Sequence, residues 1–180
     1  MKSKTLILFL LFAFYQTGFG QFEASKSYAG PSLGLSFLGS TFQLGLNYEY
    51  GMPLSAIGMS GPGKIGVGGL FRYWSYSEGF GTGEWSYTNI LVGAQGNYHF
   101  ALDNRMWDPY LGLVLAYNIA SVKWEGVKGF GWADRSAGGF WLGLHGGVRY
   151  FFTPKTALNL RFGFGTLDYG ALEIGVDFQL

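Results

Sequence analysis

The sequence predicts an all-β protein, an eight-stranded antiparallel transmembrane up-and-down β-barrel. Apolar and polar residues alternate over most of the chain, which is the period of a β-strand. Four of the alternating stretches finish alike, with large apolar residues at i and i+2. These endings are Asn47–Tyr50, Asn97–Phe100, Arg149–Phe152 and Asp177–Leu180. Aromatic residues at strand ends are typical of the belts where a barrel meets the membrane surface.

Eight alternating segments follow one another along the chain. They are roughly Ser32–Leu38, Thr41–Tyr50, Lys64–Tyr76, Trp85–Phe100, Tyr110–Val122, Gly138–Phe152, Ala157–Gly165 and Tyr169–Leu180. After residue 20 no apolar stretch reaches the roughly 20 residues that a spanning helix needs, so strands must make any membrane crossing. The segments fill most of residues 21–180, which predicts one barrel domain there.

The N-terminus has the features of a secretory signal peptide. Lys2 and Lys4 precede an apolar run from Leu6 to Tyr15, and Gly18-Phe19-Gly20 forms a small-x-small cleavage site. The apolar run is about ten residues long, too short to span a bilayer as a helix. Residues 1–20 are therefore expected to be removed.

Composition excludes several functional classes. Without Lys2 and Lys4 the chain has ten basic and eleven acidic side chains, so it lacks the basic footprint of a nucleic-acid-binding protein. It has no cysteine, which excludes disulfides, thiolate metal sites and a lipoprotein anchor. The 31 glycines and 19% aromatic residues suit short strands, tight turns and interface belts.

Pairing of the first two segments tests the alternation. If Gly39-Ser40 is a two-residue hairpin loop, Phe37 lies opposite Phe42 and Leu35 opposite Leu44. The other face then pairs polar residues with polar residues. One register sorts both faces, as it must where the two faces meet different surroundings.

The second and fourth hairpins are sorted in the same way. For the second, a loop at Ser77–Glu84 and a Trp74–Tyr87 pair keep the apolar residues on one face. For the fourth, a loop at Thr166–Asp168 places Arg161 opposite Glu173.

Charge placement indicates which face meets lipid. Six charges lie well inside the strands, all opposite the main apolar face. They are Glu49, Arg72, Arg149, Arg161, Glu173 and Asp177. Because a lipid-facing Lys or Arg at mid-bilayer costs about 2–4 kcal/mol, the apolar face is expected outside and the charges in the lumen. A soluble barrel would instead need many outward charges.

Three acids and three arginines can pair, and buried charges must. An eight-stranded barrel is just wide enough for side chains to fill, so we expect a lumen charge network that plugs the barrel, with a gated ion path as the alternative. Inward Leu70, Leu91, Val114 and Trp141 also argue against an open pore.

A second candidate site is a group of aromatic residues near the extracellular loops. Its members are Trp85, Tyr87, Trp124 and Trp132. Two interpretations are open: cross-strand packing that caps the top of the lumen, or an exposed rim that contacts a partner, a glycan or lipopolysaccharide. This placement assumes a periplasmic N-terminus, so that odd-numbered connections are extracellular.

Five motifs carry a family resemblance. They are Tyr48-Glu49-Tyr50-Gly51, the glycine-rich Gly63–Gly69, Gly96–Phe100, Asp108–Gly112 and Arg149–Lys155. In these the chain resembles the small eight-stranded outer-membrane barrels of the OmpA/OmpX type in Gram-negative bacteria, and most of all the outer membrane protein β-barrel domain family. The resemblance implies the bacterial outer membrane, contact with its lipids and lipopolysaccharide, and insertion by the barrel assembly machinery. These barrels usually end in Phe or Trp, whereas this chain ends in Leu180.

The resemblance implies a fold more than an activity. The chain has two histidines, and neither His99 nor His145 belongs to the His-x-Ser pair of the outer-membrane lipid A deacylases. We therefore expect a non-catalytic barrel, without metal or cofactor, that has a structural or surface-interaction role. The alternatives are a narrow channel or porin-like pore and, third, a lipid-active barrel enzyme.

Overall fold

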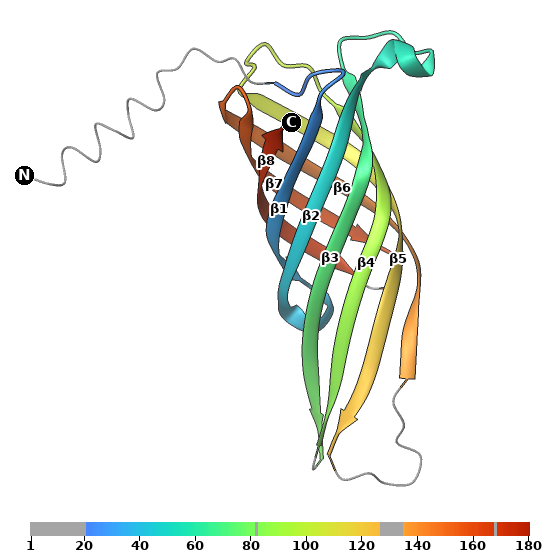
Figure 1. Ribbon diagram of the computed structural model, residues 1–180. Coiled ribbons are helices and arrows are strands. Elements are labelled where there is room, and N and C mark those ends of the chain that lie inside the picture. The colour runs from blue at the N-terminus through green and yellow to red at the C-terminus, as the bar shows by residue number, and fades with distance from the viewer. Residues whose placement is uncertain (1–20, 82, 127–134, 168) are drawn as a thin grey trace, which may run out of the picture.

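The structure is a computed structural model that describes residues 21–81, 83–126, 135–167 and 169–180. The expected signal peptide and Trp132 lie outside these residues. Eight strands form a closed barrel in which each pairs antiparallel with its neighbours in sequence and β1 pairs with β8 (Figure 1). The strands are β1 Ser27–Ser36, β2 Thr41–Pro53, β3 Lys64–Phe80, β4 Gly83–His99, β5 Trp107–Glu125, β6 Arg135–Thr153, β7 Thr156–Gly165 and β8 Gly170–Gln179. The predicted fold class is confirmed.

The two faces of each strand differ as the alternation predicts. In β2, Leu44 is 59% exposed and Leu46 57%, whereas Asn47 and Glu49, at alternate positions, are buried. The exterior therefore carries mainly large apolar side chains, and the polar and charged side chains well inside the strands lie in the interior. This is the inverse of a water-soluble barrel and fits a transmembrane one.

Two predicted hairpin registers are wrong by two residues. Leu35 lies opposite Phe42 rather than Leu44, and Trp74 lies opposite Asn89 rather than Tyr87. In both hairpins the inward and outward faces stay as predicted, because only a shift by an odd number exchanges them.

The turns explain both shifts. The first is a four-residue turn over 37–40 that contains the 3-10 element η1 (Leu38–Ser40), with Gly39 and Ser40 at positive φ. In the second, the strands continue until Phe80 lies opposite Gly83, so most of the expected loop is sheet. The fourth hairpin is as predicted, with Arg161 opposite Glu173.

Strands β3 to β6 are much longer than their neighbours. They have 17 to 19 residues, whereas β2 has 13 and β1, β7 and β8 have 10. Tyr28 pairs with Gln179, so both ends of the described chain lie at the same end of the barrel. We call this the terminal end. At the opposite, far end, β3 to β6 project beyond the barrel (Figure 1). We call this projection, residues 76–80, 83–87, 117–125 and 135–140, the extension.

Helical structure in the described part of the chain is confined to short turns. Besides η1, a second 3-10 element, η2 (Leu54–Ile57), lies in the β2–β3 connection. Among the described residues, no helix is long and apolar enough to cross a membrane.

Candidate functional site

The lumen near the terminal end is organised around Arg149 of β6. Its guanidinium contacts three carboxylates from three other strands: Asp177 Oδ2 at 2.6 Å, Glu49 Oε2 at 2.5 Å and Asp108 Oδ2 at 3.5 Å. All four side chains are at most 3% exposed. One buried cation thus joins β2, β5, β6 and β8 through charge-assisted contacts, which are stronger than neutral hydrogen bonds.

His99 extends this cluster. Its Nδ1 lies 2.9 Å from Asp108 Oδ1 and its Nε2 lies 3.0 Å from Glu49 Oε1. Both ring nitrogens are therefore occupied by carboxylates that also contact Arg149. The imidazole is held in the wall rather than directed at an open space.

The segment before β1 covers the cluster. Phe22 is fully buried and stacks on the His99 ring, with centroids 3.6 Å apart. It also stacks on Tyr28, whose hydroxyl accepts a hydrogen bond from the Glu23 backbone N–H at 2.8 Å. The Arg149 guanidinium lies 5.4 Å from the Phe22 ring centroid, within cation–π range. Phe22 therefore seals the terminal end of the lumen.

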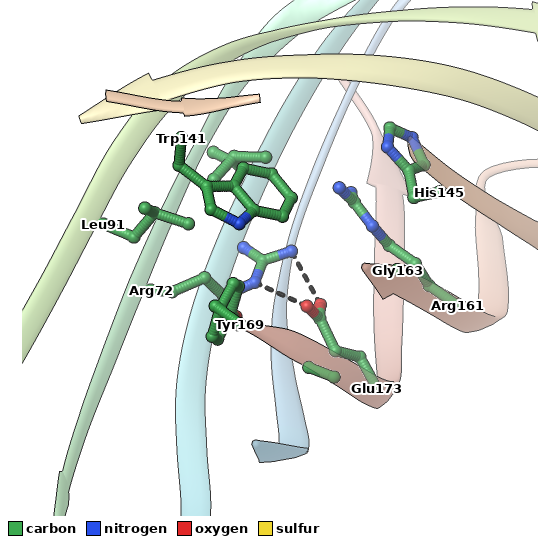
Figure 2. Close-up of a pocket in the computed structure, with 10 residues that line it drawn as sticks. Arg72, Leu91, Trp141, His145, Arg161, Gly163, Tyr169 and Glu173 are labelled. Carbon is green, nitrogen blue, oxygen red and sulfur yellow. Dashed lines mark hydrogen bonds and ion pairs between the residues drawn. The ribbon is translucent and has the colours of Figure 1, made fainter. Parts of the chain in front are cut away.

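A second charged group lies in the lumen farther from the terminal end, between β3 and β8. Arg72 donates from Nε to Glu173 Oε1 at 2.8 Å and from Nη2 to Glu173 Oε2 at 2.6 Å, a bidentate ion pair (Figure 2). Gln43 and Ser32 also donate to the Glu173 carboxylate. Both of its oxygens are thus fully used.

Arg161 does not form the ion pair with Glu173 that the cross-strand register suggested. It donates instead to Gln95 Oε1 at 2.8 Å and to Asn47 Oδ1 at 3.4 Å. Side chains in a narrow lumen reach across to strands that are not sheet neighbours, so backbone register does not determine the ion pairs. The structure places all six predicted network residues in the buried interior.

An apolar layer fills the lumen between these charges and the far end of the barrel. The Trp74 and Tyr169 rings stack at 4.6 Å, and Trp141 meets Tyr169 edge-on at 5.5 Å. The buried cluster consists of Leu70, Trp74, Leu91, Val114, Ala116, Trp141, Tyr169 and Ala171. Within the described residues this layer closes the far side of the lumen.

The predicted aromatic group lies in the extension. Tyr87 stacks on Tyr76 with centroids 4.6 Å apart, and Trp85 packs against its cross-strand partner Trp124 at 5.1 Å. Trp85 and Tyr87 are half-buried and Trp124 is buried. The aromatic residues therefore pack on one another along one face of the extension.

Two members of the interior escaped the sequence reasoning. Asp108 was expected in the connection 101–109, but β5 begins at Trp107 and directs Asp108 inward. The signal was available, because Asp108 and Tyr110 continue the alternation of the following strand. Phe22 had no such signal, since it lies before any periodic segment. No three His, Cys, Asp or Glu side chains in the described ranges are grouped so that they could hold a metal ion.

Comparison with solved structures finds bacterial outer-membrane barrels. The N-terminal β-barrel domain of Pseudomonas aeruginosa OprF superimposes with a TM-score of 0.57 at 13% identity, over 87% of this chain and 98% of that one. Neisserial surface protein A gives 0.52 at 22% identity, over 86% and 95%. The attachment invasion locus protein Ail of Yersinia pestis gives 0.52 at 14% identity, over 88% and 100%.

This chain has the fold of the small eight-stranded outer-membrane barrels. The likeness covers nearly the whole length of each of these solved barrels. No family model matches the chain, and no curated protein matches it significantly in sequence. At these identities the comparison extends to the fold and not to an activity.

Proposed function

We propose that the protein is a non-catalytic barrel of the bacterial outer membrane whose extension contacts an extracellular partner. The observation that carries this proposal is the contrast between a filled lumen and four strands that continue beyond the barrel. Rigid barrels commonly carry their variable chemistry at the loops and strand ends outside the membrane.

The extension has the composition of a contact surface. Its Tyr76–Tyr87 and Trp85–Trp124 pairs come from adjacent strands, with Glu84 and Lys123 beside them. Aromatic residues with a polar rim are enriched where proteins bind partners. One solved barrel with this fold is an attachment protein, so the fold is compatible with such a role.

Orientation follows from the same features. The terminal end, with its aromatic strand endings, is assigned to the periplasmic interface, and the extension to the outside. Outer-membrane lipids and lipopolysaccharide would then surround the apolar exterior, and the barrel assembly machinery would insert it. No role in binding nucleic acid is proposed.

Catalysis and conduction both lack support. His99, bonded on both sides to carboxylates and covered by Phe22, has no free nitrogen for a substrate. His145 is 1% exposed and bonds to Asn97 Oδ1 at 2.6 Å. A pore would need a polar path, whereas Leu91 and Trp141 belong to the apolar layer that crosses the lumen.

The proposal can be tested by measuring the adhesion of bacteria that carry the protein on their surface. Retention of these cells would be measured on polysaccharide, on extracellular-matrix protein and on other bacterial cells. We expect a W85A/W124A variant, and a chain shortened over 126–136, to insert normally but to lose retention. A W107A variant changes the same residue type at the terminal end and should behave as wild type. Equal retention of all four proteins on every surface would refute a contact role for the extension.

A further inference from the structure

A small cavity lies in the lumen between the Arg72–Glu173 ion pair and the apolar layer. Its volume is about 20 Å³, and its wall includes Arg72, Arg161, Glu173, Trp141 and His145. A polar cavity needs roughly 10–15 Å³ to hold a water molecule. The space therefore accepts one water molecule or one monatomic ion.

Positive charge exceeds negative charge around this cavity. Glu173 is the one carboxylate on its wall, and Arg72 already contacts both of its oxygens. Arg161 makes no ion pair among the described residues, and both of its hydrogen bonds leave from Nη1 to neutral amide oxygens. A buried charge without a counter-charge is costly. In Figure 2 the guanidinium groups of Arg72 and Arg161 point toward the same space.

A further donor at the cavity lacks an acceptor. Trp141 is 4% exposed, and its Nε1–H has no hydrogen-bond partner within the described part of the chain. An indole nitrogen can only donate. Trp141 Nε1 thus presents a donor without an acceptor on the same wall as Arg161, a cation without a counter-charge. This combination suits an anion.

We propose that the cavity binds one halide ion, chloride in the cell, as a structural counter-ion of Arg161. A bound chloride would separate the two guanidinium groups and accept hydrogen bonds from Arg161 and Trp141. It would be enclosed as the barrel closes, because the apolar layer lies on one side and the Phe22 seal on the other. The competing occupant is a water molecule, which could also donate to the unpaired Nδ1 of His145.

Refolding in different salts tests the proposal. The purified protein would be refolded from urea into detergent micelles in sodium chloride, sodium bromide or sodium gluconate at equal ionic strength. We expect the thermal unfolding temperature to rise by several degrees, saturably, in chloride and bromide but not in gluconate, which is too large for the cavity. Arg161→Gln should abolish the halide-dependent rise, and Trp141→Phe should raise the halide concentration for half-maximal effect. Lys155→Gln, which removes an exposed turn lysine, should leave it unchanged.

Bromide diffraction gives an independent test that needs no variant. Crystals of the wild-type protein refolded in bromide should show an anomalous peak within hydrogen-bond distance of Arg161 and Trp141. Density without anomalous signal would identify a water molecule and overturn the proposal. Equal unfolding temperatures in the three salts would overturn it as well.

Discussion

Arg72 and Glu173 form a bidentate ion pair across the lumen although their strands, β3 and β8, are not neighbours in the sheet. The two contacts are 2.8 and 2.6 Å, and both side chains are buried. The pair therefore joins opposite walls of the barrel, with β1 and β2 between them. This geometry predicts that the contributions of Arg72 and Glu173 to stability are coupled.

The first prediction concerns this coupling. Arg72→Ala should leave Glu173 buried without its counter-charge and lower the free energy of unfolding by about 3–5 kcal/mol. Glu173→Ala combined with it should recover part of that loss. Urea unfolding in lipid vesicles measures the two single variants, Arg72→Ala and Glu173→Ala, and the double variant.

Arg161 provides the matched comparison, because it is also buried but bonds to amides. The coupling free energy between Arg72 and Glu173 should exceed the one between Arg161 and Glu173. If the Arg72 and Glu173 changes add independently, the ion pair does not stabilise the barrel.

The second prediction concerns the lipid face. Leu44→Arg and Val92→Arg place a cation on the exposed apolar exterior, which should cost about 2–4 kcal/mol each near the bilayer midplane. Folding yield and stability in vesicles are the measurements. Ser77→Arg, in the extension, should be neutral. A neutral effect at Leu44 and Val92 would show that these positions do not face lipid.

Glycines on the lumen face allow steric crowding to be tested without any change of charge. A Cβ at Gly45 would come within 2.2 Å of Ser32 Oγ. Gly45→Ala should therefore impair folding without introducing any charge. Unimpaired folding of this variant would mean that the lumen is less tightly filled than the structure indicates.

The third prediction concerns the seal at the terminal end. Phe22→Ala removes a fully buried ring that stacks on His99, and such a truncation typically costs about 3–5 kcal/mol. Hydrogen exchange should accelerate at Ser25 and Gly51, whose backbone N–H groups bond between the N-terminal segment and β2. Phe22→Leu should lower the free energy of unfolding by less than Phe22→Ala does. Unchanged exchange in Phe22→Ala would show that the segment is held by something else.

The faces of the strands could be predicted from the sequence, but the register could not. Alternation assigns Leu44 outward and Asn47 inward, and the structure agrees. A shift of two residues preserves every face, so the pattern could not distinguish Leu35 opposite Leu44 from Leu35 opposite Phe42. Only the turn decides, and Ser40, a non-glycine residue at positive φ, gave no signal for its geometry.

The ion pairs were harder still to predict. The cross-strand neighbours Arg161 and Glu173 were placed correctly, but Glu173 bonds to Arg72 from a distant strand. Such contacts depend on the width of the lumen and on side-chain length. Phe22 was missed because a single aromatic residue in an irregular segment carries no period.

The proposed closure of the lumen is tested most directly in a planar bilayer. Insertion of the purified protein would first be established by heat-modifiable gel migration, and planar-bilayer recordings of the same sample would follow. We expect an inserted protein with no stable, ion-selective conductance. A reproducible single-channel current that disappears when Arg72 or Glu173 is changed would contradict it and support the pore.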